Sequence, residues 1–272
     1  MTVLTWADLT EGRARLDGPV SLTIGAFDGL HLGHRSLIAA IREGLPETLP
    51  VVITFSRNPS LVLGRGAFPG LILSNRQKLE RLASLGVGAV AVVDFSEEMS
   101  KLSGRVFIGL LRENLVIRTI VVGYDFRFGR DRDTDAGALA QMLRGTGTEV
   151  RVTGPVLHRG SVVSSSRIRK SIQDASFAEA GEMLLEDHSL DLRDLPVTPG
   201  GPGVSLIPRS AVSQVLPRSG RYPVACAGQD GVARCRGELT VGEDVLVLAC
   251  ASSAEGASGA ESATVMFEQF EQ

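Results

Sequence analysis

Short β-branched runs alternate with longer amphipathic stretches from Val20 to Val152, and this feature constrains the fold of the chain more than any other. Five runs predict strands: Val20–Ala26, Pro50–Phe55, Ala89–Val93, Thr119–Val122 and Glu149–Val152. Apolar residues at three- and four-residue spacings predict the helices between them: Leu32–Arg42, Asn75–Leu85, Ser103–Asn114 and Ala136–Arg144. Strands that alternate with helices form parallel sheets, so we expect an α/β fold with helices on both faces of the sheet.

A second, smaller domain is predicted after Asp187, where the composition changes. Prolines and glycines crowd residues 196–203, which disfavours helices and strand ladders, so we expect a linker or irregular crossing there. Three later runs predict a β-rich domain, with a mobile loop over Ala251–Ala260: Tyr222–Ala227, Asp244–Ala251 and Thr264–Phe270. The predicted domains are therefore 1–187 and 188–272.

Two helix starts carry the signature of a capping box, in which a side chain and a backbone amide satisfy each other's free donors. The pairs are Ser74 with Gln77 and Ser176 with Glu179. Both agree with the helical periodicity that follows them.

The composition argues against several classes of partner. Lys and Arg number 28 against 31 Asp and Glu, a net charge of −3, which favours neither nucleic acid nor an anionic membrane. No apolar run approaches the roughly eighteen residues of a membrane helix, and the start mixes acidic and basic residues unlike a signal peptide. We therefore expect a cytoplasmic protein.

Cys226, Cys235 and Cys250 lack metal-ligand or redox spacing and are expected to be reduced, buried thiols.

The strongest motif, GAFDGLHLGH, spans residues 25–34, where the first long strand ends and a helix begins. A helix start at this edge of a sheet presents free amides and a positive dipole end to a phosphate. His31 and His34 lie three residues apart, so both imidazoles can point at one phosphate and stabilise charge on its oxygens. The alternative is a loop with two surface histidines. The other candidate nucleotide contacts are Gly25, Ala26, Phe27, Asp28, Gly29 and Gly33.

Three further segments follow predicted strands and contribute candidate residues. Ser164, Ser165 and Ser166 precede Arg167 and Arg169, so hydroxyls at a helix start and planar cations could bind a polyphosphate. The alternative is a plain serine cap with solvated arginines. In the segment over 121–129, Asp125 could bind Mg²⁺ or hold a substrate ribose. Phe126 or Phe128 could stack on a flat ring, and the alternative is that they pack in the core. The segment over 54–59 is a loop at the same edge.

Over Ser21 to Leu185, these motifs resemble the adenylyltransferase module of the prokaryotic bifunctional riboflavin kinase/FAD synthetase family, within the HxGH nucleotidyltransferase group. Its first motif, GxFDGxHxGH, is intact in this chain. Its glycine-aspartate-phenylalanine loop is matched from Gly123 to Gly129, and its ISSTxIR segment by Val163 to Arg169. The resemblance implies a Rossmann-like nucleotidyltransferase domain followed by a riboflavin kinase barrel.

The resemblance also implies the reaction: AMP passes from ATP to FMN with Mg²⁺, giving FAD and pyrophosphate. The FMN phosphate attacks the α-phosphorus, so the protein supplies alignment and charge stabilisation. It further implies that His31, His34 and Arg169 are catalytic and that Gly123 and Asp125 contact the nucleotide. The implied flavin contacts are Phe55, Asn58, Pro59, Phe126 and Phe128.

Two departures from the family pattern qualify this expectation. Arg57-Asn58-Pro59 replaces the family's PHP tripeptide, so an amide stands where an imidazole titrates. The kinase segment Gly-x-Pro-Thr-x-Asn has no counterpart after Leu185, which predicts a shortened barrel without riboflavin kinase activity. Two alternatives remain: a non-catalytic paralogue that binds flavin or nucleotide, and a nucleotidyltransferase for another phosphorylated acceptor. The sequence does not indicate the oligomeric state.

Overall fold

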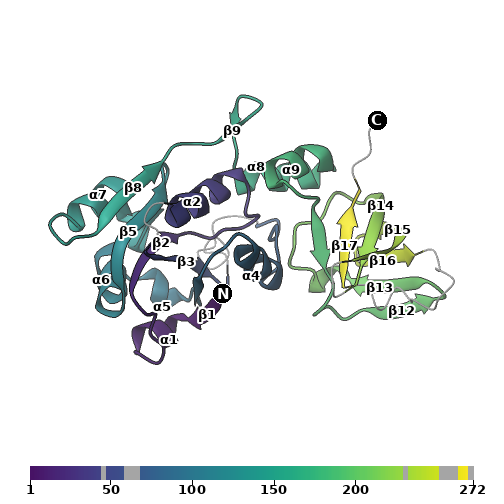
Figure 1. The fold of residues 1–272 in the computed structure, drawn as a ribbon. Helices are drawn as coiled ribbons and strands as arrows, with labels where there is room; N and C mark the ends of the chain where they lie inside the picture. The colour runs from purple at the N-terminus through teal and green to yellow at the C-terminus, as the bar shows by residue number, and fades with distance from the viewer. Residues whose placement is uncertain (44–46, 58–67, 229–231, 251–262, 269–272) are drawn as a thin grey trace. The chain divides into compact units, whose positions relative to one another are not determined.

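The predicted βα repeat forms a six-stranded sheet of all-parallel strands in the order β1-β4-β3-β2-β5-β8 (Figure 1). The computed structural model describes residues 1–43, 47–57, 68–228, 232–250 and 263–268. This sheet belongs to the first of two compact units, which comprises Met1–Phe68 and Lys78–Val162. Its strands are β1 (Thr2–Thr5), β2 (Pro19–Ile24), β3 (Leu49–Phe55), β4 (Ala89–Val93), β5 (Val116–Gly123) and β8 (Glu149–Thr153).

Helices cover both faces of this sheet, as the sequence predicts. Because successive strand residues face opposite sides, Val20, Leu22 and Ile24 share one core with α1, α6 and α7. On the other side, α2 packs against β2, β3 and β5. The helices are α1 (Trp6–Thr10), α2 (Leu32–Glu43), α4 (Asn75–Ser84), α5 (Glu97–Ser100), α6 (Gly104–Asn114) and α7 (Ala136–Met142). The α/β fold is therefore confirmed, whereas β1, α1 and α5 were not predicted.

Two short hairpins complete the first unit. β6 (Arg127–Phe128) pairs with β7 (Thr134–Asp135), and β9 (Leu157–His158) pairs with β10 (Ser161–Val162). The β6–β7 hairpin follows β5, so it extends from the sheet edge at which the candidate nucleotide-binding residues are predicted to lie.

Across both units, no helix in the described part of the chain is long and apolar enough to cross a membrane.

The second unit, Pro69–Gln77 with Val163–Gln272, is built on an antiparallel sheet. Its seven strands follow the order β11-β17-β14-β15-β16-β13-β12. They are β11 (Ser189–Asp191), β12 (Thr198–Gly201), β13 (Val204–Pro208), β14 (Gly220–Ala227), β15 (Ala233–Val241), β16 (Val245–Cys250) and β17 (Thr264–Phe267), preceded by α8 (Ser165–Gln173) and α9 (Phe177–Leu184). The predicted β-rich domain is confirmed. The predicted domain boundary at residue 187 stays a prediction.

The linker predicted over residues 196–203 is wrong in part, because Thr198–Gly201 forms the edge strand β12. It pairs with β13, and the register shifts between Pro199 and Gly201. An edge strand tolerates proline because its outward amides need no partner in the sheet. The predicted loop over Ala251–Ala260 lies outside the described residues.

One of the two predicted capping boxes is present. Ser74 N–H donates to Gln77 Oε1 at 3.0 Å, and Gln77 N–H donates to Ser74 Oγ at 3.1 Å. The box at Ser176 is wrong, because that side chain makes no capping hydrogen bond. Glu179 instead accepts from Arg167 Nη2 at 2.6 Å and from Ser171 Oγ at 3.0 Å, so a partner from α8 replaces the local one.

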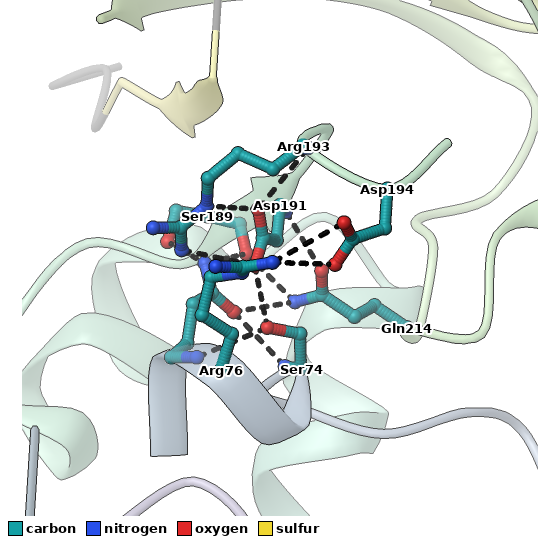
Figure 2. A network of polar contacts seen from close by, with 8 residues as sticks. Ser74, Arg76, Ser189, Asp191, Arg193, Asp194 and Gln214 are labelled. Carbon is teal, nitrogen blue, oxygen red and sulfur yellow. Dashed lines mark hydrogen bonds and ion pairs between the residues drawn. The ribbon is translucent and has the colours of Figure 1, made fainter. Parts of the chain in front are cut away.

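A buried polar network connects the segment Pro69–Gln77 to the sheet of the second unit (Figure 2). Gln214 Nε2 donates to Gln77 Oε1 and to the Ile72 carbonyl, each at 3.1 Å. Asp191 accepts from Ser74 Oγ at 2.7 Å and from Arg193 Nε at 2.7 Å. Burial raises the pKa of Asp191, but the hydrogen bonds from Arg193 and Ser74 outweigh it and leave this pKa below its usual value.

We expect Asp191→Asn to lower the free energy of unfolding of the second unit by about 3 kcal/mol at pH 7, because it removes one partner of a buried ion pair. A depressed carboxylate pKa stabilises the fold above the unfolded pKa, and this contribution is lost as pH falls through the folded pKa. Thermal unfolding between pH 7 and pH 2 should therefore show a constant difference between the parent and the variant down to about pH 4 and a shrinking one below it. Asp194→Asn is the control, since its ion pair with Arg76 is exposed and is worth less than about 1 kcal/mol. If both variants lost the same amount of unfolding free energy at pH 7, the prediction would be contradicted.

Candidate active site

A sharp turn joins the end of β2 to the start of α2 and carries the GAFDGLHLGH motif. Hydrogen bonds with β3 hold its first residues, because Gly25 N–H donates to the Ile53 carbonyl and Thr54 Oγ1 donates to the Ala26 carbonyl. Gly29 has φ +93°, a left-handed conformation that favours glycine. The turn therefore directs the chain back across the carboxyl end of the sheet.

His31 and His34 form a stacked pair at the start of α2. Their ring centroids lie 3.7 Å apart with an interplanar angle of 15°. A Cβ at Gly33 would lie 3.3 Å from the His31 ring, so glycine permits this close approach. His34 N–H donates to His31 Nδ1 at 3.4 Å, which leaves the proton of a neutral His31 ring on Nε2. His31 is buried, and so is Nδ1 of His34, which excludes the alternative of two surface histidines.

Lys78 is a buried cation beside this pair, and sequence reasoning missed it. Its Nζ donates to the Phe55 carbonyl at 2.6 Å. Burial lowers the pKa of Lys78 to about 8, although the negative charge of Asp28 raises it in part, so the amine is mostly protonated near neutral pH. Burial and then repulsion from His31 and Lys78 hold the pKa of His34 well below its usual value. The site thus combines a neutral His34 with a positive Lys78.

A pocket of 660 Å³ opens within the first unit at the ends of β2, β3 and β4 and in the loop after β5. This volume suits a small ligand. Phe55, Phe126 and Phe128 line it, so the structure brings these three predicted residues together. Asn58 and Pro59 lie outside the described residues. The lining also includes side chains that the sequence reasoning did not select: Phe95, Met99, Lys101, Phe107, Arg127, Arg130 and Arg132.

Contacts with the start of α6 fix the pocket loop that follows β5. Asp133 Oδ1 accepts from Gly104 N–H at 3.0 Å and from Thr134 Oγ1 at 2.8 Å. A Cβ at Gly129 would lie 2.1 Å from that carboxylate oxygen, so only glycine fits there. Earlier in the loop, Phe126 N–H donates to the Gly123 carbonyl at 3.1 Å, and Asp125 between them is exposed. The loop therefore presents aromatic rings and guanidinium groups to the pocket and a carboxylate to solvent.

The serine-rich segment belongs to the second unit. The order of the motifs in the sequence predicts that this segment meets the histidine pair at one sheet edge and binds the same polyphosphate, and this stays a prediction. Ser164 caps α8 by accepting from Arg167 N–H at 3.3 Å, which confirms the capping role. The arginines are not simply solvated, because Arg167 pairs with Glu179 and the buried Arg169 donates from Nε to the Gly70 carbonyl at 2.9 Å.

A parallel α/β sheet whose strand leads into a helix at this edge is typical of nucleotide-binding enzymes, in which phosphates bind at such helix starts. Comparison with known proteins gives the family. The sequence profile of the FAD synthetase family matches residues 14–167. The chain belongs to the FAD synthetase family and is a nucleotidyltransferase.

Relatives of known description agree with this assignment. The bifunctional riboflavin kinase/FMN adenylyltransferase of Escherichia coli (strain K12) is 33% identical over 215 residues, which cover 76% of this chain and 68% of that protein. A FAD synthetase of Listeria monocytogenes is 32% identical over 167 residues, covering 60% of this chain and 67% of that protein. The crystal structure of a macrolide-efflux protein from Streptococcus pneumoniae has a TM-score of 0.78 at 22% identity, over 98% of this chain and 89% of that chain, which shows a shared fold.

Proposed function

We propose that this chain transfers AMP from ATP to FMN, forming FAD and pyrophosphate, and does not phosphorylate riboflavin. A phosphate oxygen of FMN forms a bond to the α-phosphorus of ATP. The bond from that phosphorus to the oxygen bridging to the β-phosphate breaks, and pyrophosphate leaves with the electron pair. No protein nucleophile is needed, so alignment and charge stabilisation carry the catalysis.

The observation that carries the proposal is the presence of a phosphate-type helix start and an aromatic, cationic pocket in the same unit. Gly25 and Ala26 line the pocket and also begin the histidine-bearing turn. An isoalloxazine ring suits the phenylalanine side chains, and the FMN phosphate suits the guanidinium groups of Arg127, Arg130 and Arg132.

At the phosphates we assign donor roles to the histidine pair. His31 would donate from Nε2 to an ATP phosphate oxygen, and His34 would act as a neutral ring. Lys78 would supply nearby positive charge. The family resemblance implies that Ser164, Ser165 and Arg169 bind the leaving pyrophosphate.

The donor set also fits Mg²⁺ supplied with ATP. Mg²⁺ is commonly held by one or two carboxylates together with substrate phosphates and water. Among the residues that the structure describes, no three carboxylates gather into a cage, whereas the exposed Asp125 offers one ligand at the end of β5. When bound, the ion would neutralise charge on the phosphates, and Asp125 would hold it.

One incubation tests both parts of the proposal. Purified protein with ATP and Mg²⁺ should convert FMN to FAD and should leave riboflavin unphosphorylated, because the kinase segment Gly-x-Pro-Thr-x-Asn is missing after Leu185. Chromatography of the flavins measures both reactions. Binding of FMN without product would identify a non-catalytic paralogue, and no response to flavins would indicate another acceptor. FMN formed from riboflavin would contradict the loss of kinase activity.

A further inference from the structure

Three adjacent strands of the second unit bring all the cysteines of the chain to one place. Cys226 on β14 is the cross-strand partner of Cys235 on β15. Gly237, two residues beyond Cys235 and therefore on the same face, is the partner of Cys250 on β16. The three Sγ atoms lie within 4.8 Å of one another, and those of Cys226 and Cys250 are 3.2 Å apart. Residues 24 positions apart in the sequence thus converge on one point.

A disulfide does not explain the convergence of Cys226 with Cys250. Their Sγ atoms are 3.2 Å apart, well beyond the about 2.05 Å of a disulfide bond, and all three cysteines are free thiols. A bond between Cys226 and Cys250 would also have to pass over β15, which lies between β14 and β16.

The sulfur spacing matches instead what one metal ion requires. Three thiolates bound at about 2.3 Å to a tetrahedral ion lie about 3.8 Å apart, a value between 3.2 Å and the 4.8 Å limit of the cluster. Small rotations of the side chains, without movement of the strands, would therefore equalise the three distances. Cys226 and Cys250 are buried, whereas Cys235 is half-buried and leaves a route for an ion to enter.

We propose that Cys226, Cys235 and Cys250 bind one thiophilic d¹⁰ metal ion, Zn²⁺ or Cu⁺, through three thiolates. Soft sulfur ligands select these ions over Mg²⁺ or Ca²⁺. Binding exchanges three S–H protons for three metal–sulfur bonds, with no change in oxidation state. Zn²⁺ would take a water as its fourth ligand, and Cu⁺ would be trigonal. The site would fasten β14, β15 and β16 together, and it is independent of the proposed transferase chemistry.

Metal titration of the full chain tests the site. The protein is reduced, stripped with a chelator and titrated without oxygen with Zn²⁺ or Cu⁺ against a chromophoric competitor, while elemental analysis gives the stoichiometry. We expect one ion per chain, a higher unfolding temperature when it is bound, and thiolate charge-transfer absorption with Co²⁺ as a probe. The relative affinities distinguish the zinc and copper forms.

Two variants separate the cluster from incidental binding. Cys235→Ser changes a half-buried side chain, so the fold should persist while metal affinity falls by more than about 10²-fold, because loss of a ligand costs more than loss of a group that only supports one. Met266→Leu is the control, because it removes another soft sulfur. Met266 on β17 is the cross-strand partner of Ala225, the residue before Cys226, so its side chain is on the opposite face of the sheet and its loss should leave metal affinity unchanged. The proposal is overturned if neither ion binds at one per chain, if Cys235→Ser binds as tightly as the parent, or if mass mapping finds a Cys226–Cys235 disulfide in protein purified without oxidant.

Discussion

Replacement of His31 or His34 by Ala is expected to lower kcat for FAD formation by about 10²–10³-fold. In the proposed mechanism each imidazole donates to phosphoryl oxygens, whose charge grows as the bond to the leaving pyrophosphate breaks. An interaction made mainly in the transition state lowers kcat and kcat/KM together and changes substrate affinity little. Steady-state kinetics with ATP and FMN measure this directly.

A second substitution at His31 tests whether the ring acts as a hydrogen-bond donor. His31→Gln keeps an amide donor in place of the ring N–H, so its loss should be smaller than that of His31→Ala if hydrogen bonding is the function of the ring. His158→Ala is the matched control, because that histidine lies in the β9–β10 hairpin of the same unit. Unchanged rates in both alanine variants, with circular dichroism showing an intact fold, would remove the proposed mechanism.

The elements around the histidines were predictable because their signals are local. Apolar periodicity defined α2, and the β-branched runs Val20–Ala26 and Pro50–Phe55 defined β2, which leads into the turn, and β3, which hydrogen bonds to it. In contrast, β1 has four residues and forms the edge of the sheet by pairing with β4 more than eighty residues later. Short edge strands depend on such distant pairing, so neither propensity nor alternation could identify this one.

Sequence reasoning missed other features for a similar reason: each depends on a contact with a different element of the fold. Lys78 looks like an ordinary helix lysine, and only the fold places it against the Phe55 carbonyl and near Asp28. At α9, Glu179 had the spacing of a cap but pairs with Arg167 in a different helix. The cysteines likewise have no motif spacing, because the antiparallel register of β14, β15 and β16 brings them together. Long-range pairing decides each case.

Phe126→Ala is expected to raise KM for FMN by about 10–100-fold, with a much smaller effect on KM for ATP. Phe126 lines the pocket proposed for the flavin, and its ring lies 5.1 Å from that of Phe128. Loss of an aromatic stacking surface for a flat ring costs about 1–3 kcal/mol. The effect should therefore fall on the acceptor, since the proposed ATP contacts lie at the histidine turn.

Tyr124→Ala is the matched control for this prediction, because Tyr124 belongs to the same loop but is 50% exposed and does not line the pocket. Direct FMN binding, followed by quenching of flavin fluorescence, separates affinity from turnover. The parent and Tyr124→Ala should bind FMN alike, whereas Phe126→Ala should bind it more weakly. If Phe126→Ala instead weakened ATP binding as much as FMN binding, the pocket would have to be assigned to the nucleotide, and the flavin would need a site elsewhere on this edge of the sheet.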